Sequence, residues 1–291
     1  MSRYQTPQAL RRALEDRLLA LVRREGGDIN RLRRQTAFDR LLCRLFREAN
    51  APWLLKGGYA MELRIQAART TRDIDLAIRQ LPGGVRQWDE AAIRNLLENA
   101  AGFDLGDSFE FIIGEPTMDL DAAPYGGSRY PVEAQMAGRR FAQFHLDVSA
   151  GDVLWEPYEI LEGRNWLGFA ELPRAKMSAV SREEQFAEKL HAYTLPRQGR
   201  PNTRVKDLVD LVFSSLTGPN GEQCGQRDMH ERHTNFPRQI HTEPLRNRGG
   251  ASQKTCYKLA TAKESPCGLL SQSPCRSTGC ETFSGRGSSG S

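Results

Sequence analysis

The sequence predicts an α+β fold in which a small mixed β-sheet is flanked by helices. Leucine recurs at helical spacing at the start of the chain, apolar and polar residues alternate in its middle, and helical spacing returns before residue 217. These observations divide the chain into N-terminal basic helices over 1–50, a core sheet over 51–160, a helical part over 161–217 and a tail over 218–291. We expect the helical part to be truncated and the tail to be disordered.

Two helices are expected at the start of the chain. Thr6 can cap the first helix, Pro7 can be its first residue, and Gly26-Gly27 ends it. Its apolar side would consist of Leu10, Leu14, Leu18 and Leu21. Asp28 or Asn30 can cap the second helix, whose buried stripe would be Phe38, Leu41, Leu42, Leu45 and Phe46.

A strand, a glycine turn and a helix come next. Residues 53–55 predict a short buried strand that continues through Lys56 into Gly57-Gly58, and helical spacing resumes over 59–65. Residues 72–78 alternate, so that Ile74, Leu76 and Ile78 share one face and Asp73 and Asp75 share the other. Further strands are expected at 109–113, 130–136 and 144–148, with a helix at 88–101.

Two more helices end the patterned part of the chain. Ser181 and Glu184 make a capping box that opens a helix, with Phe186, Leu190 and Tyr193 on its apolar side. The helix over 203–216 is expected to bury Val205, Leu208, Val209 and Val212. The loop between them, over 195–202, is basic.

The sequence beyond residue 217 has neither helical nor strand periodicity. It holds only eight Leu, Ile, Val, Met, Phe or Trp residues in 74 positions, yet five of the six cysteines lie there. So little apolar surface cannot offset the entropy of ordering the segment. We therefore expect that the native reading frame is lost between residues 213 and 225. A natural flexible tail is the alternative, although such tails are usually poor in cysteine.

Charge and cysteine usage bear on partners and compartment. Residues 1–47 hold twelve Arg against five acids, a bias that suits a phosphate backbone placed near a carboxylate site, or simply two solvated helix faces. Cys43 is the single cysteine before residue 217, which indicates a reducing compartment. The first residues lack the apolar run of a signal peptide, and no stretch approaches the length of a membrane span. A cytoplasmic protein without a membrane partner is expected.

Two aspartates on one strand form the centre of the predicted site. Asp73 and Asp75 are two residues apart and therefore point to the same side. Paired carboxylates are tolerated best with cations between them, and Mg²⁺ binds through one or two carboxylates plus substrate phosphates. Gly57-Gly58 lets backbone amides approach a phosphate closely. Asp147, opposite the apolar residues of its own strand, can supply a third acid. This pattern indicates a nucleoside triphosphate site with two Mg²⁺ ions.

The order of these motifs resembles that of the AbiEii/AbiGii nucleotidyltransferase toxins, a minimal polymerase-β-like family. The similar motifs span roughly residues 38 to 213. They are the Gly-Gly turn, Arg69-x-Thr71-x-Asp73-x-Asp75, Asp147, the run 188–192 around Lys189, and Arg204-x-Lys206-Asp207-Leu208-x-Asp210.

The resemblance implies a role for each matching residue. Catalysis would depend on Asp73, Asp75, Asp147 and Lys189, and the three aspartates would bind the metal. Nucleotide binding would involve Gly57, Gly58, Arg69, Thr71, Lys189, Arg204, Lys206, Asp207 and Asp210. The implied activity is transfer of a nucleoside monophosphate from an NTP to an RNA acceptor of the tRNA type. The protein would be the toxin of a toxin–antitoxin or abortive-infection system with a cognate antitoxin.

Two alternatives remain open from the sequence. An adenylyltransferase acting on a small hydroxyl compound such as an aminoglycoside would use the same metal chemistry, but the Arg-rich start of the chain favours a polyanionic acceptor. A non-catalytic or damaged protein of the same fold is the second alternative. A D-x-D strand by itself is most often an exposed edge, and His145 is interpreted as structural.

Overall fold

The computed structural model describes residues 4–65, 70–79, 89–120, 123–152, 154–196 and 201–216. The chain divides into two compact units, residues 1–236 and 237–291, and every described residue belongs to the first. The predicted tail over 218–291, the lost reading frame, Arg69 and part of the basic loop over 195–202 therefore lie outside the described residues.

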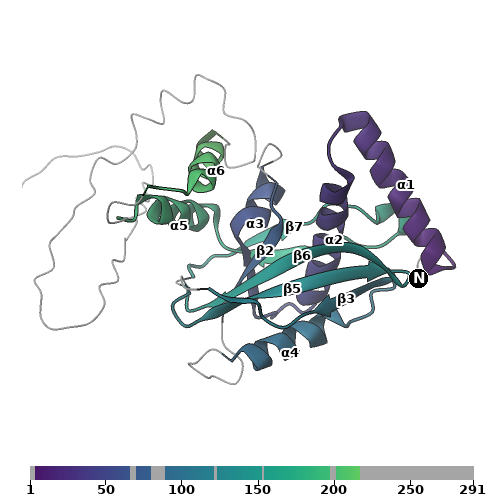
Figure 1. Cartoon of the computed structure of the whole chain (residues 1–291), viewed down its shortest axis with the longest axis horizontal. Helices are drawn as coiled ribbons and strands as arrows, with labels where there is room; N and C mark the ends of the chain where they lie inside the picture. The colour runs from purple at the N-terminus through teal and green to yellow at the C-terminus, as the bar shows by residue number, and fades with distance from the viewer. Residues whose placement is uncertain are drawn as a thin grey trace, which may run out of the picture. The chain divides into compact units, whose positions relative to one another are not determined.

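The described part of the chain is built around one mixed sheet (Figure 1). Its strands are β1 (Trp53–Lys56), β2 (Asp73–Ile78), β3 (Phe109–Ile113), β4 (Met118–Asp119), β5 (Gly127–Met136), β6 (Arg139–Ala150), β7 (Glu159–Glu162) and β8 (Lys176–Ala179). They follow the order β3-β5-β6-β2-β1-β8-β7, and β4 pairs with β5. β2 pairs with β6 and β1 with β8 in parallel, whereas the other pairs are antiparallel. The predicted α+β class with a mixed sheet is confirmed.

Six α-helices accompany the sheet in the described residues: α1 (Pro7–Glu25), α2 (Ile29–Leu45), α3 (Gly57–Arg64), α4 (Glu90–Ala101), α5 (Arg182–Thr194) and α6 (Val205–Leu216). The side chains of Thr6, Asp28 and Ser181 cap α1, α2 and α5, as their sequence positions predict. Of the two caps proposed for α2, Asp28 is the one observed. No described helix has the length and apolar character to cross a bilayer.

The two faces of the sheet differ in what covers them. Ile74, Leu76 and Ile78 of β2 belong to the main core, together with buried residues of α1, α2 and α4. Leu54 of β1 and Ala77 of β2 point to the other face of the sheet, where they form a separate small cluster with Val180. The face that carries Asp73 and Asp75 therefore lies away from the main core.

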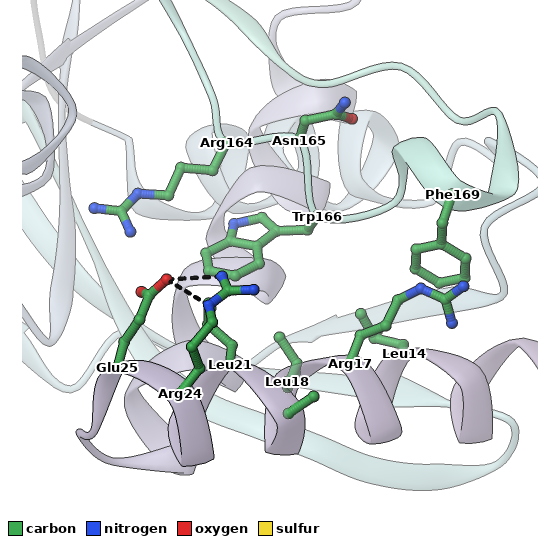
Figure 2. A pocket seen from close by; sticks show the side chains of 11 residues that line it. Leu14, Arg17, Leu18, Leu21, Arg24, Glu25, Arg164, Asn165, Trp166 and Phe169 are labelled. Carbon is green, nitrogen blue, oxygen red and sulfur yellow. Dashed lines mark hydrogen bonds and ion pairs between the residues drawn. The ribbon is translucent and has the colours of Figure 1, made fainter.

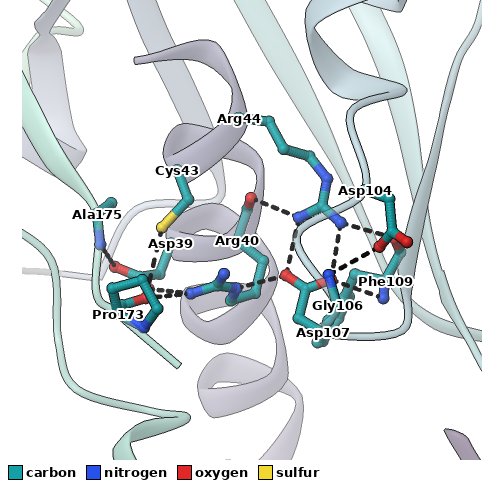
Figure 3. A network of polar contacts seen from close by, with 10 residues as sticks. All are labelled: Asp39, Arg40, Cys43, Arg44, Asp104, Gly106, Asp107, Phe109, Pro173 and Ala175. Carbon is teal, nitrogen blue, oxygen red and sulfur yellow. Dashed lines mark hydrogen bonds and ion pairs between the residues drawn. The ribbon is translucent and has the colours of Figure 1, made fainter. Parts of the chain in front are cut away.

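Two arginines of the basic N-terminal helices, Arg40 and Arg44, are structural (Figure 3). The buried guanidinium groups of Arg40 and Arg44 both donate to Asp107, with Arg40 Nε 2.7 Å from Oδ2 and Arg44 Nη2 2.7 Å from Oδ1. Arg40 also donates to the Pro173 carbonyl at 2.6 Å. These bonds attach α2 to two distant loops, so these two arginines of the Arg-rich residues 1–47 face inward.

The structure corrects the apolar sides expected for the last two helices. Leu190 of α5 and Val205, Leu208, Val209 and Val212 of α6 are exposed. The buried residues are instead Glu184 and Gln185 in α5 and Asp210 and Leu211 in α6, while Phe213 packs against α3. Polar contacts to neighbouring elements therefore decide the orientation of these helices, and such contacts leave no apolar periodicity in the sequence.

Candidate active site

A row of four charged residues crosses the face of the sheet that lies away from the main core. Arg129 on β5 is in register with Asp147 on β6, Asp147 with Asp75 on β2, and Asp75 with Lys56 on β1. Residues in register on neighbouring strands share a face, so two carboxylates lie side by side with a cation at each end. Asp73 lies two residues before Asp75 on β2 and is in register with His145. The structure thus brings the three predicted metal-binding acids to one face.

Asp75 is seated directly against the Gly57-Gly58 turn. The Gly58 amide donates to Asp75 Oδ2 at 3.3 Å. Gly57 has φ +63°, and a Cβ at this position would lie 2.1 Å from Asp75 Oδ2. Glycine is therefore required at residue 57 both for the backbone conformation and for the approach of the carboxylate.

The electrostatic environment of Asp75 disfavours its negative charge. Burial is the largest cause and the nearby charge of Asp147 is the next, and together they raise the pKa of Asp75 to about 6. The Gly58 hydrogen bond and Lys56 oppose this shift. A bound cation would offset the same repulsion.

Arg129 holds the third acid. Its Nε donates to Asp147 Oδ1 at 2.7 Å and its Nη2 to Asp147 Oδ2 at 2.6 Å, so both carboxylate oxygens accept from one guanidinium. The same Nη2 lies 3.9 Å from Asp73 Oδ2, and Asp73 Oδ1 lies 3.2 Å from His145 Nδ1. The hydrogen bond to Asp147 raises the pKa of Arg129.

Lys56 connects the other end of the row to the loop after β6. Its Nζ lies 2.7 Å from Asp152 Oδ2, which also accepts from Ser149 Oγ at 2.6 Å. Although burial acts to lower it, the charges of Asp152 and Glu188 raise the pKa of Lys56. Burial also raises the pKa of Glu188. Lys56 thus lies among three acids when its partner in register, Asp75, is included with Asp152 and Glu188.

Helix α5 reaches the glycine turn through Gln185. The Gln185 amide donates to the Gly57 carbonyl and accepts from Arg64, which also donates to the Val180 carbonyl. Lys189 lies four residues after Gln185 and therefore on the same side of α5. The predicted catalytic lysine thus belongs to the helix that contacts the turn.

The predicted residues of the last motif mainly bind one another. Lys189 Nζ lies 2.7 Å from Asp210 Oδ2 and 3.5 Å from Asp207 Oδ1, and Arg204 Nη1 lies 3.1 Å from Asp207 Oδ2. Asp210 is buried against Lys189, whereas Lys206 is exposed.

Thr71 contacts the backbone before β2. Its hydroxyl lies 3.2 Å from the Asp73 carbonyl and 3.5 Å from the Asp73 amide, and the buried carboxylate of Glu62 lies 3.4 Å from the Thr71 amide. These contacts position Asp73. The nucleotide contact that the resemblance implies for Thr71 stays a prediction.

Sequence reasoning missed Arg129, Lys56 and Gln185 as members of this site. The alternation of strand β5 could have placed Arg129 on a polar face, but its partner strand depends on register. Gln185 carries no sequence signal, because its contact is made by a side-chain amide to a backbone carbonyl far away in sequence.

The donor set suits a divalent cation, although Arg129 occupies part of it. Three carboxylates on one face are the hard oxygen ligands that Mg²⁺ prefers, and burial together with the charge of Asp147 raises the pKa of Asp75. Among the described residues, no group of three His, Cys, Asp or Glu side chains is arranged as a ready cation site.

A separate groove of about 580 Å³ lies between α1 and residues 164–169 (Figure 2). Arg17, Arg24 and Arg164 line it together with Trp166 and Phe169. The Arg17 guanidinium lies 3.8 Å from the centroid of the Phe169 ring, and Arg24 pairs with Glu25 at 2.7 Å. The groove therefore combines positive charge with aromatic rings.

Several solved structures are similar to this chain. It is similar to JHP933 from Helicobacter pylori, with 19% identity and a TM-score of 0.40 over 63% of this chain and 65% of that chain. It is also similar to MenT4, a nucleotidyltransferase toxin from Mycobacterium tuberculosis H37Rv, with 12% identity and a TM-score of 0.44 over 79% and 98%. The chain thus spans less than two thirds of JHP933. No curated protein matches it.

A family match identifies the chain. The family model described as nucleotidyl transferase AbiEii toxin, type IV toxin–antitoxin system, matches residues 40–254, which are 215 of the 291 residues. The match includes all the motifs that carried the resemblance and continues past residue 217, where the apolar pattern ends. The chain belongs to the AbiEii nucleotidyltransferase toxin family.

Proposed function

We propose that this chain transfers a nucleoside monophosphate from an NTP to an RNA acceptor of the tRNA type in a Mg²⁺-dependent reaction. The observation that carries the proposal is the juxtaposition of Asp75 and Asp147 in register on adjacent strands, with Asp75 against the Gly57-Gly58 turn. Family membership supports the nucleotidyltransferase class. It also leads us to propose a cognate antitoxin.

The three aspartates would hold the metal. Asp73, Asp75 and Asp147 present carboxylate oxygens on one face, and Mg²⁺, when bound, would supply charge stabilisation for the triphosphate and lower the pKa of the attacking hydroxyl. The chain's own contribution is to fix these acids: Thr71 holds the backbone of Asp73, and the glycine turn supports Asp75.

The glycine turn and α5 are the elements that we assign to the triphosphate. The turn opens helix α3, whose N-terminal amides attract phosphate oxygens. Lys189 adds a positive charge on the side of α5 that contacts the turn. Asp210 and Asp207 would orient this ammonium group, with Arg204 and Lys206 as further cations near the start of α6.

The groove between α1 and residues 164–169 supports a nucleic-acid acceptor. Grooves that bind single-stranded nucleic acids combine cations along the backbone with aromatic rings for the bases. Arg17, Arg164 and Trp166 provide both features, whereas Arg40 and Arg44 are buried and do not contribute.

Transfer of labelled nucleotide to RNA tests the proposal. The purified chain is incubated with each of the four α-³²P-labelled NTPs, Mg²⁺ and total tRNA, with Asp75→Asn as the inactive control. We expect labelled tRNA that disappears with EDTA and with the variant. Labelling of an aminoglycoside instead of RNA would favour the alternative acceptor, and no labelling of either would contradict the proposal.

A further inference from the structure

The acids of the candidate active site have counter-ions supplied by the protein itself. The row across β5, β6, β2 and β1 reads positive, negative, negative, positive: Arg129, Asp147, Asp75 and Lys56. The two cations differ in what they hold. Lys56 is directed to Asp152 at 2.7 Å, outside the row, whereas Arg129 is directed to Asp147 inside it.

Arg129 uses the ligand positions that a metal at Asp147 would need. Its two bonds, at 2.7 and 2.6 Å, occupy both oxygens of Asp147, and its Nη2 is 3.9 Å from Asp73. Parallel bonds between a guanidinium and a carboxylate are among the strong polar contacts in proteins. A cation that takes an oxygen of Asp147 must therefore break or share one of them.

We propose that Arg129 is a positioning residue that competes with divalent metal for Asp147 and Asp73 and yields when the nucleoside triphosphate arrives. The inference rests on the proposed function, because it takes these aspartates as metal ligands. Without metal, Arg129 neutralises acids that would otherwise repel one another. Once displaced, its guanidinium needs another anion, and the triphosphate is the anion that the reaction brings to this face.

The exposure of Arg129 fits this exchange. Its side chain is 29% exposed and its guanidinium contacts Asp147 and Asp73, whereas its neighbour Tyr130 belongs to the core. The guanidinium can therefore leave Asp147 without disturbing buried packing. Metal and nucleotide then favour each other's binding, because metal binds Asp147 and the nucleotide binds Arg129 of the same ion pair. Such coupling between two ligands is reciprocal.

Mn²⁺ binding measured by titration calorimetry tests the proposal on the full chain. Arg129→Gln removes the competing charge, so we expect Mn²⁺ to bind about tenfold more tightly than to the wild type, the scale on which groups around metal ligands change affinity. A non-hydrolysable α,β-methylene NTP analogue should strengthen Mn²⁺ binding in the wild type and do so less in Arg129→Gln. Arg23→Gln, on the exposed side of α1, is the matched control and should behave as the wild type.

A second variant, Arg129→Lys, tests the proposal if Arg129→Gln does not fold. Arg129→Lys keeps the charge but cannot make two parallel bonds, so its Mn²⁺ affinity should fall between those of the wild type and Arg129→Gln. Thermal unfolding of each variant establishes whether it is folded. If Arg129→Gln is not folded, the Mn²⁺ affinity of Arg129→Lys relative to the wild type decides the test.

The outcomes separate this inference from the proposed function. Equal or weaker Mn²⁺ binding by the folded variants, with binding still abolished by Asp75→Asn, would overturn the competition alone. If neither the wild type nor any variant binds Mn²⁺, the metal site fails and the inference fails with it.

Discussion

Asp75, a proposed metal ligand, is held in an environment that disfavours its charge. It accepts from the Gly58 amide, lies against Gly57 and has Asp147 as its neighbour in register. Burial, followed by the charge of Asp147, raises its pKa to about 6 from 3.8. Between pH 3.8 and about 6, the carboxyl group is therefore protonated in the folded state and ionised in the unfolded state. The free energy of unfolding falls as the pH rises through this range.

Asp75→Asn should abolish nucleotide transfer without weakening the fold. We expect transfer to fall by at least about 100-fold, because a metal ligand is lost. At pH 8 the variant should unfold at the wild-type temperature or above, since it lacks the unfavourable charge. Calorimetric unfolding and the tRNA labelling assay check the two parts, and retained transfer would remove Asp75 from the catalytic residues.

Asp39 makes a second prediction that concerns stability alone. Burial, opposed by Arg40, raises the pKa of Asp39 to about 7. Its Oδ1 accepts from the Ala175 amide at 3.4 Å, and the side-chain oxygen of Asn can accept the same hydrogen bond. The stability of the wild type should therefore fall as pH rises from about 4 to 7, and Asp39→Asn should lose this dependence. Unfolding temperatures of both proteins at pH 5 and pH 8 test it. A difference between them that does not change with pH would contradict the assigned shift.

At the scale of elements, Lys189 connects α5 to α6 through ion pairs with Asp207 and Asp210. Lys189 and Asp210 are 2.7 Å apart, and their side chains are only 11% and 1% exposed. The pair therefore has a structural role in addition to the catalytic role that the family resemblance implies for Lys189. The two roles can be separated, because the structural role needs both partners and the catalytic role needs the ammonium group.

Lys189→Met should lower both stability and transfer. Removing one partner of a buried pair costs about 3–5 kcal/mol, because a charge stays buried. The double variant Lys189→Met with Asp210→Leu should recover much of that stability but not the transfer activity. Urea unfolding and initial rates at low and high NTP measure the two effects. Full activity in the folded double variant would leave Lys189 with a structural role only.

For the whole molecule, the sequence predicted the features that depend on one helix or strand better than the contacts between different elements. The caps at Thr6 and Ser181 and the strand over 109–113 are as predicted, because local hydrogen bonds and alternation determine them. β5 and β6 are longer than expected, and β7 and β8 were not expected, because their pairing partners lie far away in sequence. The D-x-D motif located the centre of the site, but Arg129 joined it only through strand register.

The last prediction concerns where the folded part of this chain ends. The loss of apolar periodicity and the five late cysteines predict a boundary near residue 217, whereas the family match continues to residue 254. If the reading frame is lost near residue 217, limited proteolysis should leave a core that ends there, as mass spectrometry of the fragments would reveal. The exposed apolar residues of α5 and α6, among them Leu190 and Val212, should then make that core prone to aggregation. A protected fragment that extends to about residue 254, or one that contains Cys256 to Cys280, would show that the later sequence belongs to the fold.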